Sequence, residues 1–263
     1  MNLKRIWGFL VRDLQDWLSY KYEVFFWLVN AFVGAITYSF LGTNVGLESP
    51  EIIDKYGGSF LAFLLVGMSY NYLIYASLDA PRDAINPWNL MWNMLIPASL
   101  YEVVVGSVCF RYLVGVFQFV MYLSIASAFG VVFNVNLLST FVAVALGVAV
   151  MWGLGMIGAG VQIITKRWDP VTWFFTMLSS LLSGVCFLYE LLPASLQTVS
   201  KIIPQRYILE MLRSAMLRAE PITALWDSLI PLLISALGFL LIGALVYSKS
   251  IKYAKEHGTV GEY

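Results

Sequence analysis

The sequence predicts an all-α protein that crosses a lipid bilayer several times. Of its 263 residues, 60% are hydrophobic and only 12% are charged, and the mean hydropathy is +0.77. Soluble domains carry about 25% charged and about 45–50% apolar residues, so the composition excludes an ordinary soluble domain. A disordered chain would need low hydrophobicity and a high net charge, and it is excluded as well.

Six apolar runs are long enough for transmembrane helices, because a bilayer core needs about 20 residues per helix. They cover residues 24–41, 60–78, 103–133, 137–164, 171–189 and 229–247. We therefore expect a six-helix membrane domain over residues 22–248 and a cytoplasmic tail over 249–263. The glycines between Gly153 and Gly160 have the small-xxx-small spacing that lets two helices approach closely.

Residues 1–21 are predicted to form an amphipathic helix that lies in the membrane interface. Apolar residues such as Leu3, Trp7, Leu10 and Trp17 recur every three or four positions, and the charged residues fall largely on the opposite side. A soluble helix packed on a partner protein is the alternative.

Lysine and arginine gather in alternate loops, which predicts the orientation. They precede the first span and follow the second, fourth and sixth, whereas the loop after the first span carries only Lys55. Both termini are therefore expected in the cytoplasm, which requires an even number of spans. The chain is predicted to be an integral protein of the plasma (inner) membrane.

The segment 190–224 departs from this charge pattern. It carries Lys201, Arg206, Arg213 and Arg218 although it lies nominally outside. Its apolar residues are too interrupted for another span, and Pro204 is suited to the first turn of a helix. We expect a re-entrant hairpin in the outer leaflet, with an amphipathic helix that begins near Pro204.

Two charged residues within or beside the spans have two interpretations each. Arg111, in the third span, could pair with Glu23 or Asp79, or it could contact an anionic substrate headgroup. Glu190, at the outer end of the fifth span, could cap the hairpin or line the outer exit of a transport pathway.

No catalytic or metal-binding motif is present in the sequence. It lacks the phosphate-binding loop of ATPases and the motifs of zinc proteases and serine hydrolases, so we expect no enzyme activity and no bound cofactor. The single histidine is His257, and Cys109 and Cys186 are expected to be buried apolar residues, so no metal site is predicted. Lys and Arg number 16, as do Asp and Glu, which gives no positive excess for nucleic acid.

The cytoplasmic segment 79–100 between the second and third spans is predicted to contain a short helix. Asn86 before Pro87 is a helix-start signal, and Pro97 ends the segment. One face of this helix carries Trp88, Met91, Trp92 and Leu95. A helix this short is only marginally stable in water, and we therefore expect a partner protein or the membrane interface to stabilise it.

Two sets of residues resemble the type 2 ABC exporter permeases, the transmembrane subunits of ATP-driven exporters. The first set is Leu95, Ile96, Pro97, Ala98 and Ser99, followed by Glu102 and Gly106, and it resembles their cytoplasmic coupling segment. The second set is Ser183, Gly184, Leu192, Pro193, Ile203, Pro204, Tyr207, Leu209, Glu210 and Arg213, and it resembles the segment after their fifth span. The six-span plan with a re-entrant outer hairpin also fits this family.

The resemblance implies a dimer of this chain that rests on a separate ATPase subunit. ATP and Mg would be bound by that partner and not by this chain. The coupling segment would contact the ATPase through Asn86, Trp88, Met91, Trp92, Leu95 and Pro97. The substrate pathway or outer gate would involve Arg111, Gly184, Glu190, Pro204, Tyr207 and Arg213.

Two other classes of function remain open at this point. An ion-coupled secondary transporter would show inverted repeats and intramembrane carboxylates. A membrane-embedded enzyme or assembly factor would need a polar cluster, for which Asp79, Arg82 and Asp83 are the candidates. The few polar side chains in the spans favour an amphipathic or lipid-linked substrate; they include Asn30, Thr37, Tyr38, Asn71, Gln118 and Gln162.

Overall fold

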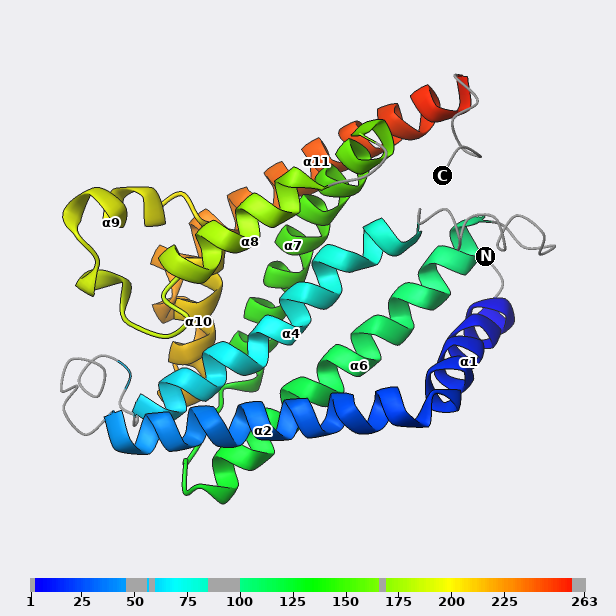
Figure 1. Cartoon of the computed structure of the whole chain (residues 1–263). Coiled ribbons are helices and arrows are strands. Elements are labelled where there is room, and N and C mark those ends of the chain that lie inside the picture. Colours follow the sequence, from blue (N-terminus) through cyan, green and yellow to red (C-terminus); the bar gives the residue numbers. More distant parts are fainter. Residues whose placement is uncertain (1–2, 46–55, 57–59, 85–99, 166–168, 257–263) are drawn as a thin grey trace.

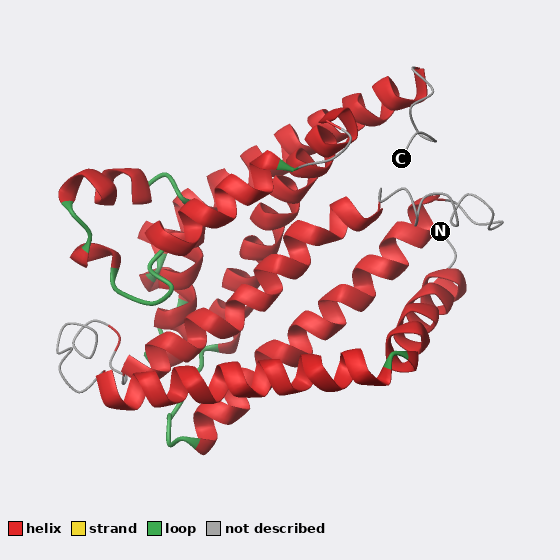
Figure 2. Cartoon of the chain, viewed as in Figure 1, coloured by secondary structure: helices red, strands yellow, loops and turns green. Residues whose placement is uncertain are grey.

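The computed structural model of the chain describes residues 3–45, 56, 60–84, 100–165 and 169–256. Over these residues the secondary structure is helical, and they contain no strand (Figure 2). The predicted all-α fold class is confirmed.

Five helices in the described part are long and apolar enough to cross a membrane. They are α2 (Lys21–Val45), α4 (Phe60–Ala84), α6 (Leu100–Ala128), α7 (Leu137–Thr165) and α11 (Trp226–Glu256). Their apolar stretches contain between 20 and 29 residues. These helices correspond to the first, second, third, fourth and last predicted spans.

The third predicted span ends earlier than expected. Helix α6 stops at Ala128, and Gly130 adopts a φ of +85°. Glycine enters this left-handed conformation without steric cost, and the conformation ends the helix. The connection that follows is tied to residues 204–217, because the Asn136 amide donates to the Ala215 carbonyl at 2.8 Å.

The fifth predicted span, 171–189, differs most from the structure. Helix α8 covers only Pro170–Leu182, which is 13 residues and about 20 Å at 1.5 Å per residue. Its start is well defined, because the Asp169 side chain accepts a hydrogen bond from the Thr172 amide at 3.0 Å. Its continuation is blocked at Gly184, where φ is +76°.

The consecutive helices run back and forth along the bundle, as Figure 1 shows. Helix α1 (Leu3–Ser19) and the last turns of α11 lie at one end, which we call the terminal end. The opposite end, which we call the hairpin end, holds α9 (Ala194–Ser200) and α10 (Pro204–Leu217). Two short 3₁₀ turns, η2 (Tyr189–Leu191) and η3 (Ile222–Ala224), flank these helices in the chain.

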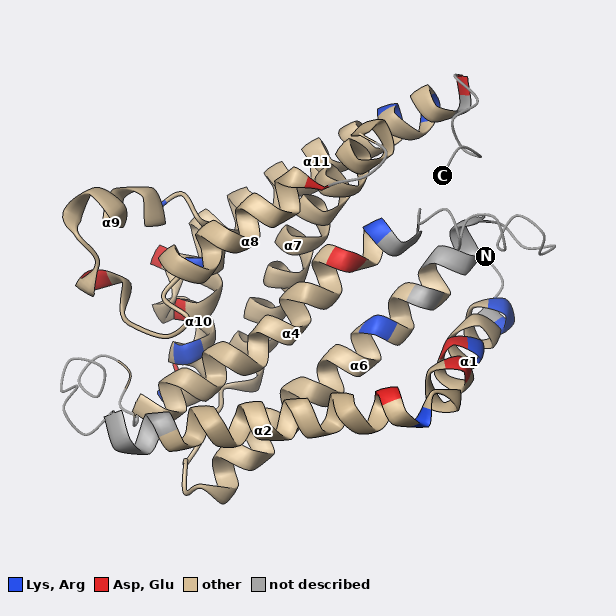
Figure 3. Cartoon of the chain, viewed as in Figure 1, with Lys and Arg blue, Asp and Glu red and all other residues tan. Residues whose placement is uncertain are grey.

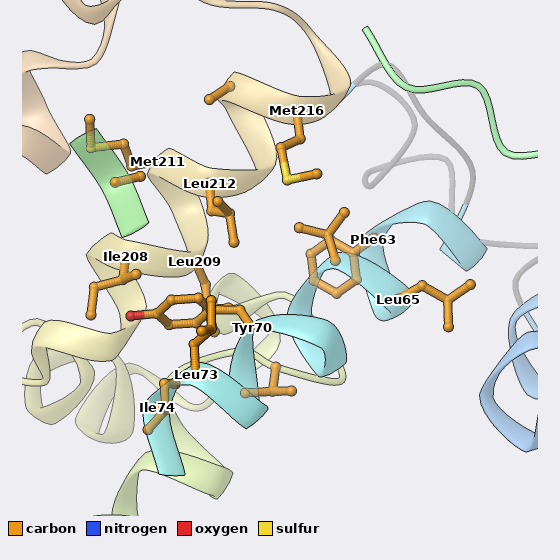
Figure 4. Packing of buried hydrophobic residues seen from close by; sticks show 14 of the residues in the cluster. Phe63, Leu65, Tyr70, Leu73, Ile74, Ile208, Leu209, Met211, Leu212 and Met216 are labelled. Atoms are coloured by element: carbon orange, nitrogen blue, oxygen red, sulfur yellow. The ribbon is translucent and has the colours of Figure 1, made fainter. Parts of the chain in front are cut away.

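Helix α10 begins at Pro204 as predicted, and it is covered by other helices. Nearly all of its residues are buried, including Arg206 and Arg213. Its apolar residues pack against Phe63, Tyr70 and Leu73 of α4 (Figure 4). The helix therefore forms part of the hydrophobic core of the chain.

Helix α1 packs on the start of α6. The Trp17 ring lies 6.2 Å from the Phe110 ring and 5.3 Å from the Trp27 ring of α2. Trp7 and Leu18 remain exposed. A location in the membrane interface remains a prediction, which these exposed apolar side chains suit.

Glycines bring α7 into backbone contact with its neighbours, as their spacing predicts. A Cβ atom on Gly153 would collide with the backbone of Phe239 and Leu240 in α11, and one on Gly155 would collide with Leu78 in α4. Because lipid removes the hydrophobic drive between helices, close packing of this kind is what holds them together.

We expect Gly153→Ala to destabilise the chain by about 1–3 kcal/mol, because the added methyl group must push α7 and α11 apart. The matched control is Gly238→Ala, since a Cβ on Gly238 of α11 meets no atom within 4 Å. Thermal unfolding of the two purified variants in detergent makes the comparison. Equal melting temperatures for both would show that the α7–α11 contact is not close.

Candidate functional site

A pocket of about 300 Å³ lies between α4 and the helices around it, and we call it the central pocket. Its walls come from α2, α4, α6, α8, α10 and the loop after α8. The lining residues are Tyr38, Met68, Asn71, Tyr72, Ile74, Tyr75, Leu78, Tyr122, Phe175, Thr176, Ser180, Val185, Cys186 and Gln205. None of these residues carries an acidic or basic side chain.

Two hydrogen bonds between side chains cross the pocket lining. The hydroxyl oxygens of Tyr72 and Tyr122 lie 2.7 Å apart, and their rings are 5.0 Å apart. The Gln205 amide nitrogen donates to the Asn71 side-chain oxygen at 3.2 Å. These pairs link α4 to α6 and α10, so the polar groups are held by three helices.

The polar pairs are partly buried and lie near the middle of α4. Asn71 is the middle residue of the apolar stretch Phe60–Arg82 in α4, and Gln205 is 4% exposed. Amide side chains at the centre of a membrane span are costly and usually mark a functional site. The pocket is therefore a candidate site for ligand binding.

Arg213 of α10 holds the wall of the pocket formed by the loop after α8. Its guanidinium nitrogens donate to the carbonyl oxygens of Gly184 and Val185, each at 2.8 Å, and to that of Phe63 at 3.3 Å. The same group lies 3.4 Å from the centre of the Phe63 ring. Three segments far apart in the sequence are thus joined by one side chain.

The space for the Arg213 guanidinium depends on Gly67 of α4. A Cβ atom at Gly67 would lie 2.6 Å from Nη2 of Arg213 and 2.9 Å from the Val185 carbonyl oxygen. Arg213 is only 3% exposed. Burial lowers its pKa to about 10, which leaves the guanidinium charged at neutral pH.

The structure gathers four of the six predicted gate residues at α10: Gly184, Pro204, Tyr207 and Arg213. Gly184 contacts Arg213 directly, and Pro204 and Tyr207 lie on the same helix. The Tyr207 hydroxyl donates to the Lys201 carbonyl at 2.8 Å. Glu190 lies in η2, and its backbone carbonyl accepts a hydrogen bond from the Gln197 side chain of α9 at 2.8 Å. Their role as a gate remains a prediction.

Arg206 is the buried basic residue in this region that the sequence did not single out as a gate residue. Its guanidinium lies 3.3 Å from the centre of the Tyr189 ring and 5.5 Å from that of Tyr207. Stacking of this kind stabilises a cation where few water molecules can reach it.

Arg111 is separate from both the pocket and the gate residues. It lies eleven residues before Tyr122 in α6, about 16 Å along the helix axis. Asp79, one of its two predicted partners, forms a direct ion pair with Arg82 at 2.5 Å. Both interpretations of Arg111, pairing with a carboxylate and contact with a substrate headgroup, remain predictions.

The six predicted coupling residues lie outside the described residues. They are Asn86, Trp88, Met91, Trp92, Leu95 and Pro97. Their role therefore rests on the sequence.

The expectation that both cysteines are buried is wrong. Cys109 and Cys186 are both exposed, and both are free thiols. In a bundle whose apolar surface faces lipid, an apolar sequence context does not imply burial.

Tyr38 and Asn71 stand out in the sequence as polar residues of the spans, but their meeting in one pocket does not follow from it. A local signal was present in α4, where Met68, Asn71, Tyr72 and Tyr75 recur every three or four residues. Gln205 gave no such signal, because its position in the pocket depends on the burial of α10.

Comparison with known proteins found no matching family model and no matching curated protein. What the chain does must therefore follow from the pocket, the topology and the sequence motifs.

We expect Arg213→Lys to lower the free energy of unfolding by about 1.5–3 kcal/mol, because lysine does not reproduce the planar fork that reaches three carbonyl oxygens. Arg218→Lys is the matched control, since Arg218 is half-exposed and pairs with Glu220 at 3.3 Å on the surface. Its effect should stay within about 0.5 kcal/mol. Chemical denaturation in detergent micelles measures both values, and equal effects would mean that Arg213 does not hold the loop.

Proposed function

We propose that the chain is the membrane-spanning subunit of an ATP-driven exporter, related to the type 2 ABC permeases, that works as a dimer with a separate ATPase subunit. The observation that carries the proposal is the central pocket, where uncharged polar side chains gather at the middle of a membrane-spanning helix. Polar groups at that depth are costly and mark the routes of transported molecules. A purely structural bundle could be built more cheaply from apolar residues.

The course of α8 supports a six-pass topology. Although it is short, it runs in the direction opposite to α7 and α11 (Figure 1). The chain therefore returns to the hairpin end before α11 begins. With α8 as a short fifth pass, η2, α9 and α10 form the predicted re-entrant hairpin, and both termini lie on one side.

The distribution of charge supports a cytoplasmic position for the terminal end. Charged residues gather mostly toward the two ends of the bundle (Figure 3). Four helices that reach the terminal end carry basic residues, namely Lys4, Arg5, Arg12, Lys21, Arg82, Lys249 and Lys252. At the hairpin end, two of the four basic residues, Arg206 and Arg213, are buried in protein, whereas Lys201 and Arg218 are exposed. The inner membrane is the expected location.

An ion-coupled transporter is less well supported. Such proteins use intramembrane carboxylates or exposed carbonyl oxygens to bind the coupling ion. The described lining of the central pocket contains no carboxylate. Energy from a separate ATPase also agrees with the absence of a phosphate-binding loop from the sequence.

We expect Trp92→Ala to remove most of the ATPase that purifies with the chain. A central aromatic anchor of an interface contributes about 2 kcal/mol or more, which is about thirtyfold in affinity. The measurement is ATP hydrolysis in the eluate after affinity purification from native membranes, normalised to the amount of chain.

The control for this experiment is Trp226→Ala, which removes a half-exposed tryptophan at the start of α11, at the hairpin end. It should leave the ATPase yield unchanged. If Trp92→Ala retained the full yield, the coupling assignment would be wrong. If the unaltered chain yielded no ATPase, the exporter proposal itself would be wrong.

The dimer is expected to form through α2 and α8, as the family resemblance implies. A cysteine at Leu181, which is exposed on α8, should cross-link two copies of the chain in membranes when Cys109 and Cys186 are replaced by serine. A cysteine at Ile234, which is similarly exposed on α11, is the control and should yield monomers. Equal cross-linking at both positions would contradict this interface.

A further inference from the structure

We propose that the central pocket binds an uncharged, ring-bearing molecule with hydroxyl or amide groups, and that it rejects anions and cations of similar shape. The identification of this molecule as a transported substrate rests on the proposed function, whereas the binding itself does not.

The lining offers no counter-ion for a charged ligand. Its described residues include no acidic or basic side chain, and an unpaired charge at this depth is strongly disfavoured. The nearest buried cation behind the loop wall is Arg213, whose donors face the carbonyl oxygens of Phe63, Gly184 and Val185. The Arg213 donors are therefore already used and are not available to an anion in the pocket.

The aromatic surface of the pocket suits a planar or ring-shaped ligand. Tyr38, Tyr72, Tyr75, Tyr122 and Phe175 come from four different helices and line one space. Aromatic rings gain from stacked and edge-on contacts with another ring and from contact with the apolar face of a sugar. Such contacts need no charge on the ligand.

The polar groups of the pocket retain hydrogen-bonding capacity. An amide side chain has two donor hydrogens and an acceptor oxygen with two lone pairs, so the bond between Gln205 and Asn71 uses only part of it. The Asn71 nitrogen lies 3.9 Å from the Met68 sulfur, which is a weak acceptor that a ligand oxygen would replace. Tyr72 and Tyr122 share one hydrogen between two hydroxyls, which leaves the other hydrogen for a ligand.

The depth of these groups also restricts the ligand. With Asn71 at the middle of its apolar stretch, the ligand must reach the centre of the bilayer. A molecule with a hydrophobic ring and a few neutral polar groups can do so, whereas a permanent ion would lose its hydration.

The test uses the purified full-length chain in phosphatidylcholine nanodiscs, with three probes. Methylumbelliferyl β-D-glucoside is the neutral probe, and the glucuronide is its anionic counterpart, which differs by one carboxylate. Phenyltrimethylammonium, added as a competitor, is the cation. Fluorescence anisotropy measures binding, and empty nanodiscs correct for partition into lipid.

We expect saturable binding of the glucoside, at least tenfold weaker binding of the glucuronide, and no competition by the cation. Gln205→Glu places a carboxylate in the pocket and should weaken glucoside binding at least tenfold. Tyr122→Phe removes one hydroxyl and should weaken it about fivefold. Tyr253→Phe, at an exposed position near the end of α11, is the control and should have no effect.

Several results would overturn the proposal. Glucuronide binding as tight as glucoside binding, or displacement of the glucoside by the cation, would show that charge is not excluded. No saturable glucoside binding, or binding that Tyr122→Phe does not weaken, would show that the pocket is not the site. Because no ATPase is present in this assay, its outcome is independent of the co-purification result for Trp92→Ala.

Discussion

The buried guanidinium of Arg213 is the interaction on which the hairpin end of the molecule depends. It connects α10 to the first turns of α4 and to the loop after α8 through three carbonyl oxygens and the face of the Phe63 ring. Backbone carbonyls that lie beyond a helix end and away from water need donors, and a guanidinium supplies several in one plane. This explains how α8 can end after 13 residues without leaving its following loop unpaired.

The same contact determines the shape of the central pocket. The Val185 carbonyl is held by Arg213, while Val185 and Cys186 line the pocket. Gly67 contributes by leaving room for the guanidinium against α4. The loop wall is therefore fixed from behind, by contacts that take no part in the pocket surface. Because Arg213 holds the wall from outside the pocket, the side chains of the lining remain available to a ligand.

The sequence was sufficient where the determining contacts are local. Long apolar runs predicted the five long helices, Pro204 marked the start of α10, and glycine spacing predicted the close packing of α7. The sequence was insufficient where polar side chains form their hydrogen bonds with segments far away in the chain. Arg213 accounts for the failure to predict a buried α10, because one of its partners, Phe63, lies 150 positions away in the chain. Likewise, the pocket is lined by side chains from five helices, and only those of α4 recur in the sequence at a helical spacing.

The placement of charge along the bundle follows one energetic rule. Ionic groups such as the Asp79–Arg82 pair lie toward the terminal end, and Arg206 and Arg213 lie at the hairpin end, where rings or carbonyl oxygens surround them. Between these ends the polar groups of the pocket are amides and hydroxyls, whose burial costs far less than that of an ion once they are hydrogen-bonded. The described lining of the pocket therefore offers no counter-ion to an ion that enters from outside. The free-energy cost of burying a charge in lipid thus shapes the fold and also favours a neutral ligand in the pocket.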